Sequence, residues 1–243
     1  QGGWHVYLAP ALGGSYEDVP SNLVEYVKRD RRWTQGSLQH LRLVSRRGLH
    51  MVSRCHFVQG AMGYVSSLLW FLMLLASTAY VLLPTLAAGP VIDVSAWSPW
   101  LIIWRPNQWL SLLAVTLVLL FLPKLLALSL ALVRQSAAYG GPVRLVCSAL
   151  LEIVFAVVLA PVMMLYHTRG VLSVLTGHTV PWDPQVRDDH TLGWRRAWTT
   201  TWAITVVGIV WASGTWFLSP IFFLWLTPIF TGLLCAAPLT RWS

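Results

Sequence analysis

The stretch GAMGYVSSLLWFLMLLASTAYVLL, residues 60–83, decides the fold of this chain. It contains no charged side chain and exceeds the ~20 apolar residues that a helix needs to cross a bilayer. Because lipid offers no hydrogen-bond partners, the backbone of such a stretch is expected to be helical. Further apolar runs predict spans over about 109–133, 200–218 and 220–237. We therefore expect a mainly α-helical polytopic membrane protein with four spans.

Composition and charge agree with that fold class. Of the 243 residues, 56% are hydrophobic and 11% are charged, and the formal net charge is +8. Eight of the 17 Lys and Arg residues lie between Lys28 and Arg54, directly before the first span. Such a cluster is typical of the cytoplasmic side and of a surface of anionic lipids. The positive charge therefore indicates membrane lipids, and no nucleic acid, as its partner, and both chain ends are expected to be cytoplasmic.

The segment from Leu145 to Tyr166 is apolar enough to span but contains Glu152. If it crossed, four arginines between His167 and Arg196 would lie outside the cell, which the positive-inside rule disfavours. We therefore expect a cytoplasmic interfacial or re-entrant helix. On such a helix Glu152 is expected to face water or to pair with Arg144 or Arg169; within a spanning helix it would instead be a functional intramembrane carboxylate.

Two helices are expected before the first span. Asn22, followed three residues later by Glu25, predicts a capping box that opens a helix over about 23–33. Apolar residues at near-helical spacing over 38–58, opposite a basic set, predict an amphipathic helix in the membrane interface. Two alternatives remain for that second helix, one continuous and one broken at Gly48.

The first of these helices carries the run RDRRW, residues 29–33. Arg29, Arg32 and Trp33 are three and four residues apart, so they share one face. An indole ring can stack on the C–H surface of a pyranose, and guanidinium groups donate paired hydrogen bonds to hydroxyls or to a diphosphate. The same face also suits lipid phosphates, with the indole at headgroup depth, so the residues alone leave both interpretations open.

The RDRRW run resembles the Q-x-x-R-W element of processive family 2 glycosyltransferases such as cellulose synthase, with Arg29 in the place of glutamine. A wider resemblance, over essentially the whole chain, is to the membrane glucosyltransferases that make the backbone of osmoregulated periplasmic glucans. It is carried by five segments: GGSYEDVPSNLVEYVKRDRRWTQGSLQH (13–40), LPKLLAL (122–128), YGGPVRL (139–145), LLEIVFAVVLAPVMMLYHTRGVLSVL (150–175) and QVRDD (185–189).

This resemblance implies the C-terminal transmembrane and interfacial-helix region of an inner-membrane glycosyltransferase, with most of the GT-A catalytic core missing. Such enzymes use UDP-glucose with Mg²⁺ or another divalent cation to build a β-1,2-glucan and pass it through their own helices. The family's catalytic base and metal-binding aspartates are expected upstream of Gln1. We therefore assign no catalytic residue and no metal ligand to this chain, and expect the chain alone to be inactive. The start at Gln1, without methionine, indicates a fragment or a trimmed chain.

The resemblance also implies roles for two groups of residues. Arg29, Arg32 and Trp33 would bind the acceptor end of the growing glucan and the departing nucleotide diphosphate. A second group matches a mobile gating loop over the nucleotide, although a plain interfacial linker is an equal alternative: Trp182, Gln185 and Arg187. A periplasmic glucan-processing protein is expected to receive the product.

These expectations divide the chain into five parts. They are the edge of a cytoplasmic glycosyltransferase domain (1–21), the acceptor-motif and amphipathic helices (22–58), two spans with a periplasmic loop (59–137), the interfacial or re-entrant helix with the gating-like loop (138–199), and a transmembrane hairpin (200–243). The alternative function is a transporter or channel-like subunit without enzymatic activity. Sequence upstream of Gln1 would separate the two, because only the enzyme needs acidic catalytic motifs there.

Overall fold

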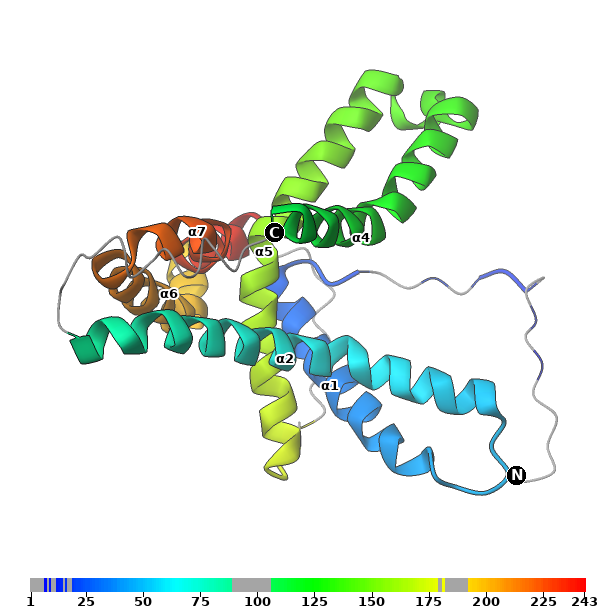
Figure 1. Ribbon diagram of the computed structural model, residues 1–243. Coiled ribbons are helices and arrows are strands. Elements are labelled where there is room, and N and C mark those ends of the chain that lie inside the picture. The colour runs from blue at the N-terminus through cyan, green and yellow to red at the C-terminus, as the bar shows by residue number, and fades with distance from the viewer. Residues whose placement is uncertain are drawn as a thin grey trace. The chain divides into compact units, whose positions relative to one another are not determined.

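A computed structural model describes the chain except residues 1–6, 8, 10–11, 15, 17–18, 89–105, 179–180 and 182–191, and except the side chains of 84–85, 87–88, 106–110 and 112–113. The described residues form helices and no strand (Figure 1). The α-helices are α1 (Leu23–His40), α2 (Met51–Ala88), α4 (Pro106–Arg134), α5 (Pro142–Leu175), α6 (Trp194–Leu218), α7 (Pro220–Leu234) and α8 (Ala236–Trp242). Two 3-10 turns, η1 (Leu41–Leu43) and η3 (Ser136–Tyr139), lie between them.

Among the described residues, four helices are long and apolar enough to cross a membrane: Met51–Leu83, Ala114–Arg134, Pro142–Leu175 and Trp194–Leu218. Helix α7 qualifies only together with α8, from which it is bent by 51°. The helical, polytopic membrane class is thereby confirmed. Three of the predicted spans match α2, α4 and α6. Helix α5 is the fourth, and its predicted interfacial placement stays a prediction because length and composition do not fix depth.

The expected amphipathic helix over 38–58 is not continuous. Helix α1 ends inside it, a turn follows, and α2 begins before the stretch ends. Gly48 has a left-handed φ of 85°, which a residue with a side chain adopts at a cost. The Arg54 guanidinium donates hydrogen bonds to the carbonyl oxygens of Val44 and Arg46, the second at 2.8 Å. Gly48 therefore permits the turn before α2, and the Arg54 side chain stabilises it by hydrogen bonds to the backbone.

The described structure divides into two compact units, Gln1–Leu82 with Val158–Ser243, and Leu83–Val157. In the second unit, Lys124 Nζ on α4 lies 2.8 Å from Glu152 Oε1 on α5. The predicted pairing of Glu152 with Arg144 or Arg169 was therefore wrong, whereas its side chain, 69% exposed, agrees with the other alternative, an exposed carboxylate. A short turn makes neighbouring helices antiparallel, so residues equally far from the turn on α4 and α5 face each other.

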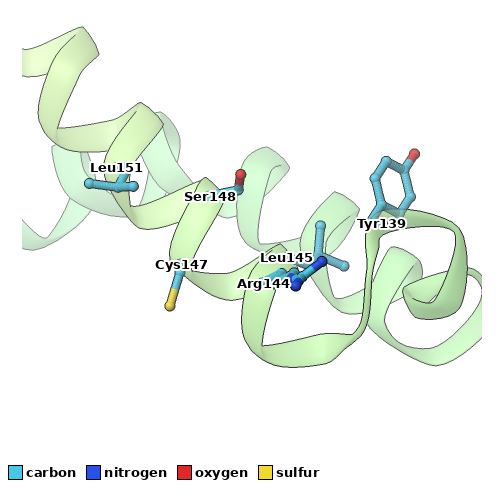
Figure 2. A pocket seen from close by; sticks show the side chains of 6 residues that line it. All are labelled: Tyr139, Arg144, Leu145, Cys147, Ser148 and Leu151. Carbon is cyan, nitrogen blue, oxygen red and sulfur yellow. The ribbon is translucent and has the colours of Figure 1, made fainter.

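The second unit also contains a hollow of 390 Å³ where α5 begins. Figure 2 shows its lining residues, Tyr139, Arg144, Leu145, Cys147, Ser148 and Leu151. Arg144 is the charged group among them, and its side chain lies against the backbone of Gly140. Because the lining holds one cation and no carboxylate, it offers neither an acid–base pair nor a set of metal ligands.

The first unit has two apolar clusters. In one, Leu23 and Val27 of α1 pack with Val162 of α5, Ile204 of α6 and Leu233 of α7. The other joins α2, α5, α6 and α7 through a second set of side chains, Leu74, Met164, Ala212, Leu226 and Phe230. Helix α1, although polar on most of its surface, is thereby anchored to the bundle by one apolar edge.

Candidate functional site

Asn22 caps the start of α1, which confirms one half of the predicted capping box, whereas the Glu25 side chain pairs with two cations instead of the Asn22 backbone. The backbone N–H of Glu25 donates to Asn22 Oδ1 at 3.1 Å. The buried Glu25 carboxylate lies 2.7 Å from Lys28 Nζ and 3.6 Å from Arg196 Nη2 on α6. These contacts hold the first turn against the bundle, and the helix continues to His40, beyond the predicted end.

We expect Asn22→Ala to lower the stability of the full-length protein by about 1 kcal/mol, because one N–H of the first turn loses its acceptor. Thermal unfolding of detergent-purified protein would measure the change. Asn22→Ser, which keeps an accepting oxygen, is the control and should stay close to the unsubstituted protein. Equal loss in both variants would contradict the assigned cap.

Apart from Glu25 in the first turn, the buried residues of α1 form one stripe, which determines where the other faces of the helix point. Leu23, Val27, Asp30 and Thr34 recur at intervals of four, three and four residues, the spacing of one helix face. Thr34 is 1% exposed and Asp30 is 7% exposed. Residues beside this stripe therefore lie at the edge of the interface, partly supported by the bundle and partly accessible.

Arg29 and Trp33 occupy that edge and stack together. The Arg29 guanidinium carbon lies 4.9 Å from the centre of the Trp33 ring and 5.4 Å from that of the Tyr26 ring. Trp33 remains 54% exposed. The structure thus brings two of the three predicted site residues into contact, and Arg32, three residues after Arg29, is also partly exposed.

Tyr26 was not predicted as a site residue, although its spacing of three residues from Arg29 was a visible signal. Burial raises the pKa of its phenol above the ordinary value, the Asp30 charge raises it further, and Arg29 partly opposes both. A raised pKa favours the neutral phenol, and Arg29 contacts the face of its ring. Arg29 is therefore flanked by two neutral aromatic rings, an arrangement that cation–π attraction stabilises.

A polar cluster lies behind this stack on the buried side of α1. Tyr64 Oη on α2 donates to Asp30 Oδ1 at 3.2 Å, and His167 Nε2 on α5 lies 2.5 Å from Asp30 Oδ2. His167 Nδ1 is 3.1 Å from Ser67 Oγ on α2. The Tyr64 and His167 rings meet edge to face, with centres 5.3 Å apart. Sequence reasoning missed this cluster, because its members come from three separate helices.

The proposed gating residues Trp182, Gln185 and Arg187 lie outside the described residues, as does most of the predicted domain edge at 1–21. Within the described part of the chain, no group of three or more His, Cys, Asp or Glu residues is arranged to hold a metal ion. The site on α1 therefore offers an aromatic platform and guanidinium donors, which suit binding and orientation of a sugar or a diphosphate.

The chain is similar along nearly its whole length to proteins named glucans biosynthesis glucosyltransferase H. It is 41% identical to the one from Cupriavidus pinatubonensis over 98% of this chain, and 42% and 41% identical to those from Klebsiella pneumoniae and Pectobacterium carotovorum over 96%. It spans 27–28% of the length of these relatives. No protein-family profile matches the chain, and no solved structure does.

Proposed function

We propose that this chain, a homologue of part of glucans biosynthesis glucosyltransferase H, forms the membrane portion of a processive glucosyltransferase. The whole enzyme would use UDP-glucose to build the β-1,2-glucan backbone of osmoregulated periplasmic glucans and pass it across the inner membrane. The observation that carries the proposal is the exposed Arg29–Trp33 stack, which lies in a chain that aligns over 98% of its length with a glucosyltransferase.

The α1 side chains would divide the binding task. The Trp33 ring offers an apolar face to the terminal sugar of the acceptor. Arg29 already covers one part of that ring, so its N–H groups would meet the sugar hydroxyls or the diphosphate that leaves. Arg32 would add a second guanidinium for the diphosphate. The chain's contribution is therefore to hold and orient the acceptor.

The remaining chemistry would come from parts of the enzyme outside this chain. The base that takes the proton of the acceptor hydroxyl, and the ligands of Mg²⁺ or another divalent cation, belong there in this proposal. The described residues offer no metal-ligand group. Asp30, the buried carboxylate near the stack, already has a partner at each oxygen, so it is a poor candidate for the base.

We further propose that the loop with Trp182, Gln185 and Arg187 gates the nucleotide site. We also propose that both chain ends are cytoplasmic. His167 of α5 contacts Asp30 of the basic helix α1. This contact supports a position of the C-terminal part of α5 on the same membrane side as α1, as the charge distribution predicts. The glucan would then leave on the opposite side, to a periplasmic glucan-processing protein.

Arg29→Ala in the full-length protein tests the role of the stack. We expect about a tenfold loss of glucan synthesis, since the variant loses both the cation–π contact and a donor to the sugar. The measurement is incorporation of labelled glucose from UDP-glucose into glucan by membranes that contain the protein. Gln39→Ala, at an exposed position near the end of α1, should leave incorporation unchanged.

The same assay separates the proposal from the transporter or channel-like alternative. If membranes with the full-length protein incorporate no glucose above membranes without it, the glucosyltransferase assignment fails. If incorporation occurs but Arg29→Ala has the rate of the unsubstituted protein, the assignment of the acceptor site to α1 fails.

A further inference from the structure

The polar cluster behind the stack attaches α1 to two other helices through one carboxylate. Asp30 has a side chain that is 10% exposed, and its two oxygens face Tyr64 of α2 and His167 of α5. A buried carboxylate without such partners would be strongly destabilising. The cluster therefore favours one docked position of α1, in which both bonds form together.

A second contact lies one helical turn further along. Thr34, which is 1% exposed, lies beside Gly170 of α5, where a Cβ would come into ordinary van der Waals contact with the Thr34 methyl at 3.5 Å. Asp30 and Thr34 are four residues apart on α1, and His167 and Gly170 are three apart on α5. Two contacts at successive turns fix how far α1 is rotated about its own axis. A shift of register by one residue would turn every side chain on α1 by about 100°.

The residues of the stack directly adjoin these attachment points. Arg29 precedes Asp30, and Trp33 precedes Thr34. Resting on the function proposed above, we infer that Asp30, His167 and Tyr64 are positioning residues, which fix the rotation of α1 and so direct the Arg29–Trp33 stack at the acceptor sugar. None of the three needs to touch the sugar for this role.

His167 can serve this role without acting in proton transfer. Its Nε2 faces the carboxylate and its Nδ1 faces the Ser67 hydroxyl, the reverse of the arrangement in the Ser-His-Asp triad of chymotrypsin-like proteases. With the proton on Nε2, the ring donates to Asp30 and accepts from Ser67. The ring therefore works as a link of defined geometry between α1, α2 and α5.

A misdirected stack should change the product rather than only the rate. Two reactions of UDP-glucose compete, transfer of glucose to the acceptor and hydrolysis by water. In each of them the bond between glucose C1 and the UDP oxygen breaks and UDP leaves. With the acceptor in place, its hydroxyl oxygen bonds to C1 and its proton passes to the catalytic base. With the acceptor displaced, water bonds to C1 instead, gives up its proton to the same base, and free glucose is released. Accurate placement of the acceptor decides between them.

The test measures the ratio of free glucose to glucan-bound glucose formed from UDP-glucose by the full-length enzyme. We expect Asp30→Ala and His167→Ala to raise this ratio about tenfold, and the double variant to raise it no further, because both act on one contact. His167→Gln keeps a side-chain donor, and Asp30→Asn can pair with the other tautomer of His167. Both conservative variants should remain near the original ratio.

Thr201→Ala is the matched control, since Thr201 is fully buried on α6 and its hydroxyl bonds to its own helix backbone. It should leave the ratio unchanged even if less protein accumulates.

If the Asp30 and His167 alanine variants lower both products in proportion, or change neither, the positioning inference is overturned. If they do not accumulate in membranes, Tyr64→Phe decides: a raised ratio supports the inference and an unchanged ratio overturns it. If Trp33→Ala loses glucan synthesis but the ratio is unchanged in the Asp30 and His167 alanine variants, only the positioning inference is overturned. If Trp33→Ala synthesises glucan normally, the proposed function is overturned.

Discussion

Glucan synthesis is expected to be lost when Trp33 is replaced by alanine in the full-length protein. The ring is 54% exposed and outside both apolar clusters, so its removal should not unfold the bundle. It would remove the platform for the acceptor and free Arg29 from its stacked position. We expect at least about a hundredfold loss, which corresponds to roughly 2.7 kcal/mol of transition-state stabilisation. UDP-glucose binding should persist, because the nucleotide pocket is proposed to lie mainly outside this chain.

Incorporation of labelled glucose and equilibrium binding of UDP-glucose measure the two expectations separately. Trp202→Ala is a suitable control, since Trp202 is an exposed tryptophan of α6 that is 60% accessible. A similar loss in both variants would point to general membrane anchoring by tryptophans, and an unchanged glucan yield in Trp33→Ala would contradict the assigned platform.

The second large effect is expected at Gly232, where α7 meets α5. A Cβ at this position would lie 2.2 Å from the Val158 carbonyl oxygen and 3.1 Å from the Pro161 ring. Neither a helix carbonyl nor a proline ring can rotate away, so α7 would have to move off α5. Small residues permit such close contact between membrane helices. We expect Gly232→Ala to destabilise the protein by about 3 kcal/mol or more.

The measurement is the midpoint of thermal unfolding in mild detergent, together with the fraction of monodisperse protein. Gly36→Ala is the matched control, because this glycine is also helical but a Cβ there would meet nothing within 4 Å. That variant should be neutral or up to about 1 kcal/mol more stable, since alanine favours the helix. Equal midpoints for Gly232→Ala and the unsubstituted protein would refute the close contact.

Hydropathy predicted which segments are helical but not where the helices end. The span predicted over 60–83 is the central part of α2, which begins at Met51 and ends at Ala88. Apolar composition marks only the part suited to lipid, whereas the backbone continues as a helix until a turn stops it. The turn before α2 depends on Gly48 and on the reach of the Arg54 side chain to three carbonyl oxygens, which residue patterns do not reveal.

In the candidate site and its surroundings, too, residue spacing predicted contacts within one helix but not contacts between helices. The shared face of Arg29 and Trp33 was predictable, because helix geometry relates residues three and four apart wherever the helix lies. The partnership of Lys124 with Glu152 was not, since it depends on how α4 and α5 pair across their turn.

The residues alone established a membrane chain of helices and a basic, aromatic face on one of them, because hydropathy and helical periodicity act over a few neighbouring residues. The direction of that face was settled only by the packed bundle. Asp30 and His167 are 137 residues apart in the chain, and Gly232 meets Val158 only where α7 crosses α5. Such contacts follow from how whole helices dock, so a local pattern carries no record of them.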